Sequence, residues 1–514
     1  MDVKSKTLNN KRLMFICYDL PLGIMRAEAH EGIGDRWFCP PASRRTDFMT
    51  MYLPGYENRP LPSPREVAAG AARHAKQLPR GERMTFTTTD QPSADVVVVG
   101  AGLAGLTVAY ALLKQGMRTL LIDAESGVAQ FSSRANGSML TEALCQPWNA
   151  PGAAKQLFAS LLTPDAGISI RSAAFPQVVP WGARFIRNSS KRHYWYVADA
   201  NARLASYSIR CLRELADELR ISFAHARSGN IQIFRDAARF EQAAAESERL
   251  QTLGLTLHTL SREEAIRVEP ALAPIGSSIQ GAIHAPGDEV GDAYLFCQRL
   301  AEAYERDGGM LRLGVSASGL LVERGEIRGV KIAGFVIRSP RVVIAAGVRS
   351  RELLRHAHFA LPVTPVKGYT LTFALPEATP IVPHMPIIDA VMHTAVVPLG
   401  DRIRVTAIAE LTGHHTHIEP ARIEQLCDIL RQTCPPLANS VEDQQGSPWA
   451  GLRPVSADGL PFIGRTQVKG LYINTGHGHL GWTFAAGSAR ILSTIICGGQ
   501  PEFDLSPYRP TRNV

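Results

Sequence analysis

Several features that would place this 514-residue chain in a special class are scarce or absent. Its eight cysteines include no Cys-x-x-Cys pair, which excludes a disulfide scaffold and a zinc ribbon and is typical of free thiols in a reducing compartment. Apolar residues make up 45% of the chain and charged residues 20%. These are the proportions of an ordinary globular protein, and they exclude a disordered or collagen-like chain.

Concentrated positive charge is also missing. The formal net charge is +8, but no run of five or more basic residues occurs. Residues 1–89 hold 14 Lys and Arg against 9 Asp and Glu, so most of the excess lies in that segment. A nucleic-acid groove requires basic residues gathered on one surface, and we therefore expect no nucleic-acid partner.

Long apolar stretches are represented by Val96–Leu113, which has 18 residues without a charge, the lower limit for a membrane span. Four valines open this run and three glycines interrupt it, which favours a buried strand that turns into a helix. The apolar patch at 13–25 contains Asp19 and Pro21 and does not fit a secretory signal. We expect a cytoplasmic protein, at most peripheral on the cytoplasmic face of a membrane.

The first ninety residues differ from the rest. They contain eight prolines and little hydrophobic periodicity, so we expect residues 1–89 to be a poorly ordered or appended extension. From Asp95 onward strand and helix patterns alternate, beginning with a strand at 96–99, a helix at 104–115 and a strand at 119–122. Further patterns predict helices at 198–219, 294–306 and 482–497 and strands at 342–346 and 471–474. The sequence therefore predicts an α/β protein.

The strongest local motif is the turn Gly100-Ala101-Gly102-Leu103-Ala104-Gly105 between the first strand and the first helix. Gly100 allows a tight turn, Gly102 lets the backbone approach a pyrophosphate, and Gly105 lets the helix pack close to the strand. The N–H groups that open the helix, at Leu103 and Ala104, can face the phosphates. Asp123 ends the second strand, 23 residues after Gly100, where a carboxylate can bind ribose hydroxyls and disfavours NADP. The spacing predicts a dinucleotide site without deciding between FAD and NAD.

Two C-terminal motifs decide the cofactor through a family resemblance. They are GLRPVSADGLPFIG at 451–464 and NTGHGHLGWT at 474–483. Together with the stretches at 147–152, 287–292 and 365–372, they resemble the D-amino-acid dehydrogenase branch of the FAD-dependent D-amino-acid/glycine oxidase family. The resemblance runs from about Asp95 to Pro507, which is nearly the whole chain after the extension.

The resemblance implies a Rossmann-like βαβ domain that binds FAD and a discontinuous, sheet-rich substrate domain. Motif placement assigns 90–160, 285–355 and 450–514 to the FAD-binding domain, and 161–284 and 356–449 to the substrate domain. The implied activity is oxidative deamination of a D-amino acid to a 2-oxo acid by hydride transfer from Cα to flavin N5. Electrons would pass to a quinone or another acceptor of the respiratory chain. FAD would bind without a covalent link, because no cysteine lies within 451–482.

The resemblance also implies roles for individual residues. Arg453 matches the arginine that holds the substrate carboxylate, a task that suits a planar guanidinium; without the resemblance it would be a structural arginine beside a proline turn. His477 and His479 are the other catalytic candidates, and His479 stands where family members usually carry a small hydroxyl residue. The bare backbone before the last helix would face the flavin. The remaining expected cofactor-binding residues are Ala346, Gly347, Gly476, Gly478, Leu480, Gly481, Trp482 and Thr483.

Two departures from the family pattern leave the substrate open. Ala390-Val391-Met392-His393 replaces a segment that is usually acidic, aromatic and basic, and Pro398 replaces a basic residue. A cyclic or N-substituted amino acid such as D-hydroxyproline is therefore an alternative substrate. A sarcosine- or glycine-type oxidase that uses oxygen, an RNA-modification protein with this fold and a non-catalytic flavin module are alternative functions. The histidine-rich loop at 413–417 does not by itself make a metal site, and we expect no metal.

Overall fold

A computed structural model describes residues 37–38, 94–153, 168–170, 175–377, 379, 381–390 and 392–514. Most of the expected extension at 1–89 lies outside these residues. Its described part is the two-residue strand β1 (Trp37–Phe38), whose backbone pairs with Gly446 and Gln445.

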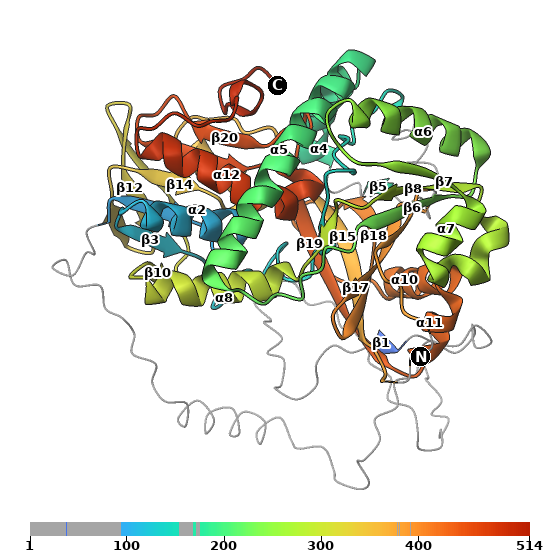
Figure 1. The fold of residues 1–514 in the computed structure, drawn as a ribbon. Helices are drawn as coiled ribbons and strands as arrows, with labels where there is room; N and C mark the ends of the chain where they lie inside the picture. The colour runs from blue at the N-terminus through green and yellow to red at the C-terminus, as the bar shows by residue number, and fades with distance from the viewer. Residues whose placement is uncertain are drawn as a thin grey trace, which may run out of the picture. The chain divides into compact units, whose positions relative to one another are not determined.

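A six-stranded sheet carries the first glycine-rich turn (Figure 1). Its strands, in spatial order, are β10 (Met310–Arg312), β3 (Thr119–Ile122), β2 (Val96–Val99), β14 (Val342–Ile344), β21 (Leu471–Thr475) and β20 (Phe462–Arg465). All neighbours are parallel except β20, which runs antiparallel to β21. The central strands are fully buried, as expected for a parallel sheet with both faces covered.

Four long helices form the main core with this sheet. They are α2 (Leu103–Lys114), α5 (Lys191–Leu219), α8 (Ala293–Arg306) and α12 (Gly481–Ile496). Helix α12 packs against both α2 and α5, and α2 also contacts α8 (Figure 1). The helices predicted at 104–115, 294–306 and 482–497 are confirmed within one residue. The one predicted at 198–219 begins seven residues earlier, because Ser190 caps it by accepting a hydrogen bond from the N–H of His193.

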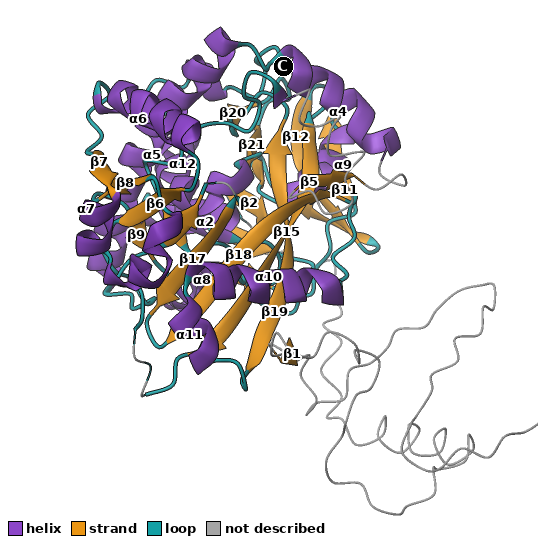
Figure 2. Ribbon diagram, turned by 90° about the vertical axis from the view of Figure 1, so that its right-hand side faces the viewer, coloured by secondary structure: helices purple, strands orange, loops and turns teal. Residues whose placement is uncertain are grey.

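A larger, ten-stranded sheet forms the second half of the fold. Its strands follow β1 in the order β19 (Gln445–Ser456), β15 (Val363–Ala374), β18 (Arg402–Leu411), β17 (Thr394–Leu399), β16 (Ile387–Asp389), β6 (Asn230–Phe234), β8 (Gly281–Ala285) and β7 (His258–Ser261), and β5 (Ile168–Ile170) pairs with β18. Helices α10 (Pro420–Thr433) and α11 (Pro435–Ser440) lie beside its long strands (Figure 2). A second apolar core fills the space between α10, α11 and the sheet.

The remaining elements connect or flank these parts. They are β4 (Met139–Leu140), which pairs with β9 (Glu289–Val290); the antiparallel sheet of β11 (Gly319–Glu323), β12 (Glu326–Ile332) and β13 (Phe335–Arg338); helices α4 (Phe175–Arg187), α6 (Ala237–Gln251), α7 (Arg262–Val268) and α9 (Ser350–Arg355); and the 3-10 turns η2 (Pro270–Ser278), η3 (Gly347–Arg349), η4 (Gly478–Leu480) and η5 (Ser506–Tyr508). The predicted α/β class is confirmed. The strands of the six-stranded sheet come from the three segments assigned to the FAD-binding domain, while the domain boundaries themselves stay a prediction.

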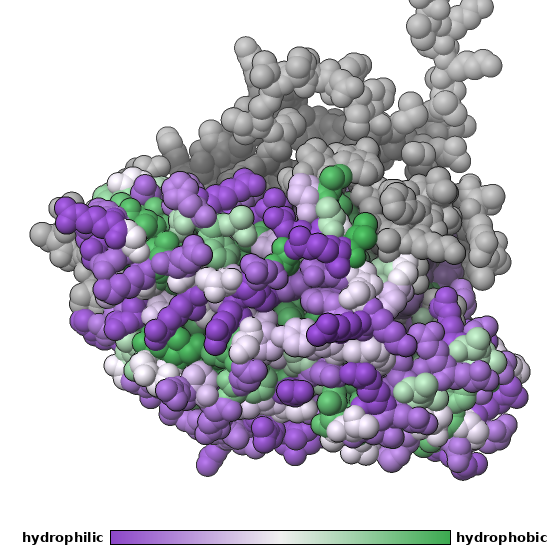
Figure 3. All heavy atoms as spheres, turned by 90° about the horizontal axis from the view of Figure 1, so that it is seen from above, coloured by the Kyte–Doolittle hydropathy of each residue, from purple (hydrophilic) through white to green (hydrophobic). Residues whose placement is uncertain are grey.

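The surface seen in Figure 3 mixes hydrophilic residues with small hydrophobic patches. Among the helices that the structure describes, none combines the length and the apolar character needed to cross a bilayer.

Candidate functional site

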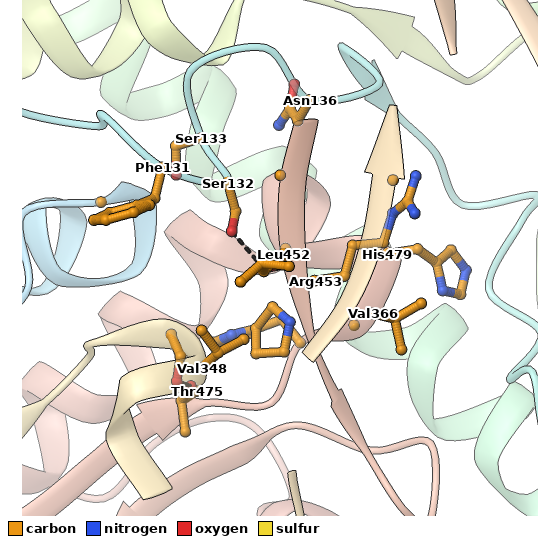
Figure 4. Close-up of a pocket in the computed structure, with 18 of the residues that line it drawn as sticks. Phe131, Ser132, Ser133, Asn136, Val348, Val366, Leu452, Arg453, Thr475 and His479 are labelled. Atoms are coloured by element: carbon orange, nitrogen blue, oxygen red, sulfur yellow. Dashed lines mark hydrogen bonds between the residues drawn. The ribbon is translucent and has the colours of Figure 1, made fainter. Parts of the chain in front are cut away.

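One cavity of about 1370 Å³ is lined by residues of both large sheets, and part of it is shown in Figure 4. Pockets for single small ligands are usually about 300–1,000 Å³, so this cavity has room for a larger ligand or for two. It brings together most of the residues expected at the site. These are Gly100, Gly102, Leu103, Ala104, Asp123, Ala346, Gly347, Arg453, His477, Gly478, His479, Leu480, Gly481 and Trp482.

Three expected residues lie outside the cavity lining and have packing roles. A Cβ atom on Gly105 would lie 1.7 Å from the carbonyl oxygen of Gly100, so glycine is required where α2 packs on the turn. A Cβ on Gly476 would lie 2.9 Å from the ring of Phe462. Thr483 accepts a hydrogen bond at its hydroxyl from the N–H of Thr141, at 3.2 Å. Direct contact of these three with a cofactor stays a prediction.

The turn 100–105 and Asp123 form what we call the dinucleotide end of the cavity. Gly100 has a φ of +109°, and a Cβ there would lie 2.6 Å from the carbonyl oxygen of Ala345, so this turn also requires glycine. Gly102 is different, because its φ of −78° suits any residue and a Cβ would approach only the hydroxyl of Ser133, at 3.4 Å. Gly102 has no side chain with which to cap α2, and the first turn holds no acidic residue, although the N–H of Leu103 donates a hydrogen bond to the hydroxyl of Ser133 at 3.3 Å. The helix N-terminus therefore remains suited to an anion.

Asp123 holds this end together from the tip of β3. Its Oδ2 accepts a hydrogen bond from the N–H of Ala101 at 2.6 Å, and its Oδ1 accepts one from the N–H of Glu125 at 2.9 Å. A carboxylate has about four lone-pair sites, so each oxygen keeps capacity for a further donor such as a ribose hydroxyl. The side chain lines the cavity, where such a donor would arrive.

The segment from Thr475 to Gly481 is fixed by hydrogen bonds to distant elements. Thr475 donates its hydroxyl hydrogen to the carbonyl of Gly347 at 3.1 Å, which joins β21 to the turn η3. Trp482 donates its indole N–H to the carbonyl of Gly291 at 3.1 Å. Helix α12 starts at Gly481 without a side-chain cap, so its first N–H groups are not taken by a capping side chain. This segment lines the cavity with bare backbone on a rigid support.

Arg453 lies on β19 in a seat formed by the two neighbouring strands. Gly368 on β15 faces it without a side chain, and a Cβ there would lie 2.1 Å from Nη1 of Arg453. On β18, Ile408 and Ala409 together oppose Gly368, which makes a bulge. Ile408 has a φ of +71°, rare for a β-branched residue, and its carbonyl accepts a hydrogen bond from Nη1 at 3.1 Å. The bulge at Ile408 and the absence of a side chain at Gly368 together place the guanidinium against the cavity wall.

The charge of Arg453 has no counter-ion in the described part of the chain, where no carboxylate lies within ion-pair distance. Burial lowers the pKa of the guanidinium from its ordinary value to about 10. Removing a cation from water without a partner is costly, so an anion that enters the cavity is favoured at this position. We call Arg453 with Gly368, Ile408, Trp148 and His479 the carboxylate end of the cavity.

Trp148 and His479 form a wall beside Arg453. Their rings stack, with centroids 5.3 Å apart and planes inclined by 10°, and the Arg453 guanidinium carbon lies 5.9 Å from the Trp148 ring centroid. His479 is exposed to the cavity, and its Nε2 lies 3.2 Å from the carbonyl oxygen of Leu144. Desolvation by the surrounding protein disfavours the charged ring and lowers the pKa of His479, and the charge of Arg453 lowers it to a smaller extent. The hydrogen bond to Leu144 acts in the opposite direction. The ring is therefore neutral at pH 7.

His477 is buried, in contrast to His479. Its Nε2 has no hydrogen-bond partner among the residues that the structure describes, and burial lowers its pKa to about 4. Besides the large cavity, it lines an adjoining cavity of about 20 Å³ together with Asn149 and Asn201. The two Asn Oδ1 atoms are also buried without a partner. His477 is thus surrounded by uncharged polar groups on this side.

Several lining residues could not have been chosen from the sequence. Ser132 donates its hydroxyl hydrogen to the carbonyl of Leu452, which ties the loop after β3 to the strand that carries Arg453 (Figure 4). Ser133 and Asn136 on the same loop line the cavity, and so does Ile408. The loop has no motif, and the bulge at Ile408 becomes visible only when β15 and β18 are paired. Gly368 lies in a stretch that carried the resemblance, but its role depends on the position of Arg453.

The residues of the histidine-rich loop 413–417 make contacts with different parts of the protein. His414 lines the cavity and lies 3.9 Å from the carboxylate of Glu352, whereas the carbonyl of His417 accepts a hydrogen bond from Lys367. Within the part of the chain that the structure describes, no group of three His, Cys, Asp or Glu residues is placed to hold a metal ion.

Comparison with known proteins settles the family. The family model described as FAD dependent oxidoreductase matches residues 95–495. The chain belongs to this FAD-dependent oxidoreductase family. It is similar in fold to glycine oxidase from Geobacillus kaustophilus, at 20% identity and a TM-score of 0.65 over 82% of this chain and 99% of the other. It is also similar to L-proline dehydrogenase from P. horikoshii, at 18% identity and a TM-score of 0.65 over 82% of this chain and 97% of the other. L-amino acid deaminase from Proteus vulgaris is similar at 16% identity and a TM-score of 0.61 over 82% of this chain and 97% of the other.

The resemblance seen in the sequence is thus confirmed at the level of the family, and the protein is a flavin enzyme with FAD as its cofactor. The cavity fits this cofactor. The N-terminus of α2, the open side of Gly102 and the spare acceptors of Asp123 suit its diphosphate and ribose, and the volume leaves room for a small substrate.

Proposed function

We propose that this FAD-dependent oxidoreductase oxidises a D-amino acid, or a cyclic imino acid such as D-hydroxyproline, at its α-carbon. The imine from an acyclic amino acid would react with water to give the 2-oxo acid and ammonia, whereas the imine from a cyclic substrate would keep its nitrogen in the ring. The observation that carries this proposal is the seat of Arg453, which presents a guanidinium without a counter-ion to the cavity. A guanidinium binds a planar carboxylate through two parallel hydrogen bonds, and every amino acid supplies a carboxylate.

The residues at the two ends of the cavity would divide the work. When bound, FAD supplies the hydride acceptor. Arg453 would hold the carboxylate so that the Cα–H points to that acceptor, and the fixed segment 475–481 would place backbone N–H groups where negative charge develops. Because His477 and His479 are neutral and weakly basic, we propose no general base. Catalysis would come from orientation and electrostatics.

The surroundings of Arg453 favour an apolar substrate side chain. Val366 is its direct partner across β15 and β19, so both side chains lie on the same face of the sheet. Val366 belongs to an apolar cluster with Trp181, Phe185 and Leu411, and all four line the cavity. A neutral aliphatic, aromatic or cyclic side chain suits this cluster, whereas a charged one would be buried without a partner.

We further propose that FAD is bound without a covalent link, since no cysteine lines the described cavity. The resemblance to D-amino-acid dehydrogenases supports transfer of electrons to a quinone at the cytoplasmic face of a membrane. Glycine oxidase and L-proline dehydrogenase are both similar in fold, so an oxidase that uses oxygen is the alternative.

A substrate panel tests the proposal. The purified enzyme would be assayed with both enantiomers of the common amino acids, sarcosine, proline and 4-hydroxyproline, each with a dye acceptor and with oxygen. We expect turnover of apolar or cyclic D-amino acids with the dye and little reaction with oxygen. Turnover of L-enantiomers alone would contradict the D-specificity, and fast peroxide formation would favour the oxidase alternative. Reaction with hydroxy acids but with no amino acid would overturn the proposed function.

A further inference from the structure

The two ring nitrogens of His479 differ: Nε2 contacts a backbone carbonyl, and Nδ1 is left for a ligand. Its Nε2 lies 3.2 Å from the carbonyl oxygen of Leu144. A carbonyl oxygen can only accept a hydrogen bond, so the hydrogen of the neutral ring is on Nε2. Nδ1 of that tautomer carries a lone pair and no hydrogen. His479 is therefore an acceptor on the side away from Leu144.

The position of this acceptor relative to Arg453 is restricted. His479 stacks on the ring of Trp148, and the Arg453 guanidinium lies over the same ring. Both His479 and Arg453 line the cavity. Figure 4 shows the side chains of Arg453 and His479 extending to the same side of the pocket. In an α-amino acid, one carbon separates the nitrogen from the carboxylate. A substrate whose carboxylate pairs with Arg453 can therefore place its amino group next to this wall.

We propose that Nδ1 of His479 accepts a hydrogen bond from the substrate amino group and so distinguishes amino acids from other carboxylic acids. This inference rests on the proposed function, because it needs the carboxylate at Arg453. It makes His479 a substrate-binding residue and not a base. The ring fixes the direction of the nitrogen, and with it the direction of the Cα–H, while the proton of an ammonium group leaves to solvent.

The chain offers a matched set of substitutions at this position. The Asn side chain places its amide at about the position of Nδ1 and can supply an acceptor there, whereas Gln reaches the position of Nε2 and can donate to Leu144. His479→Phe keeps a flat ring against Trp148 and removes both nitrogens. His414→Phe, in the same cavity and 3.9 Å from Glu352, is the control for losing a cavity histidine.

The test compares D-proline with cyclopentanecarboxylate, which has the same shape and no N–H group. Dissociation constants come from anaerobic reduction of the flavin by D-proline and from the change in the flavin spectrum on addition of cyclopentanecarboxylate. We expect His479→Phe to weaken D-proline about 10- to 100-fold, the effect of a hydrogen bond to a charged group, and to leave cyclopentanecarboxylate within about threefold. His479→Asn should recover much of the D-proline affinity, His479→Gln should not, and His414→Phe should keep the wild-type ratio.

The outcomes separate this inference from the proposed function. Equal weakening of both ligands in His479→Phe would show a structural role and overturn the inference. Unchanged affinity for D-proline would overturn it as well, because the amino group would then not depend on His479. If cyclopentanecarboxylate binds the wild type but D-proline does not, recognition of the amino group is wrong and the carboxylate site stands. If neither ligand binds, the carboxylate site at Arg453 fails and the inference fails with it.

Discussion

The two ends of the cavity are built from different kinds of sequence information. At the dinucleotide end, the turn 100–105 and Asp123 lie within one βαβ unit and are joined by a hydrogen bond inside that unit, while the more distant Ala345 and Ser133 pack on the turn. At the carboxylate end, Gly368, Ile408 and Arg453 come from three neighbouring strands of the ten-stranded sheet. The first end is a local structure that many sequences can form. The second exists only when the sheet is complete, so the position of Arg453, the proposed carboxylate ligand, depends on residues of two other strands.

The largest effect is expected from substitutions at two glycines of the same turn, Gly102 and Gly105, which should fail in different ways. Gly102→Leu should give a folded protein that contains no FAD, because its backbone suits any residue and the new side chain extends into the cavity. Gly105→Ala should instead destabilise the fold, since its Cβ would lie 1.7 Å from a backbone oxygen. The measurements are the flavin absorbance of the purified protein and its melting temperature. Normal FAD content in a stable Gly102→Leu protein would show that the diphosphate lies elsewhere.

A large catalytic effect is expected at Arg453. Arg453→Ala should lower kcat/KM by roughly 30- to 1,000-fold, because it removes a charged hydrogen-bonded contact that also aims the Cα–H. Arg453→Lys should recover part of the loss, since an ammonium lacks the planar fork. Flavin content should not change in either variant. The decisive comparison is the best amino acid against its amide: wild type should prefer the acid strongly, and a full preference in Arg453→Ala would mean that another residue holds the carboxylate.

A smaller loss of the same kind is expected from Gly368, which has no side chain to offer the substrate. In Gly368→Ala the new methyl group occupies the place of the Arg453 guanidinium, and the flexible arginine moves while the strands stay paired. We expect kcat/KM to fall about 10- to 100-fold, with partial loss of the preference for acid over amide and with normal flavin content. Gly287→Ala is the control, because an added Cβ there meets no atom within 4 Å. If Gly368→Ala keeps the wild-type preference, the seat does not position Arg453.

The same contrast explains how much the sequence could predict. The turn 100–105, Asp123 and the helix after Gly481 follow from spacing and periodicity, and the structure has these elements within a residue of their predicted bounds. The role of Arg453 followed from a family resemblance and remains a proposal. The bulge at Ile408 and the contact between Ser132 and Leu452 could not be found in this way, because they depend on the register between strands or on a contact across 320 residues. Gly105, Gly476 and Thr483 show the opposite limit: their motif gave the positions, but only packing shows that they support the lining without forming it.

The smallest expected effect concerns stability and tests whether buried His477 stays neutral in acid. The pKa of buried His477 is lowered from 6.5 to about 4, so between these values the unfolded chain binds a proton that the folded protein does not. Stability from this residue is therefore complete above pH 6.5 and falls as the pH drops towards 4, with a loss of about 2 kcal/mol by pH 5. His477→Gln removes the titration, so its unfolding free energy in urea should fall less between pH 7 and pH 5 than that of wild type.

Asp288, whose buried carboxyl has its pKa raised to about 7, acts in the opposite direction, but it is present in both proteins and its effect cancels in the comparison. The control variant is His415→Gln, which removes an exposed histidine and should lose as much stability as wild type. An equal acid loss in His477→Gln and wild type would show that His477 is protonated, or hydrated, in the folded enzyme at pH 5.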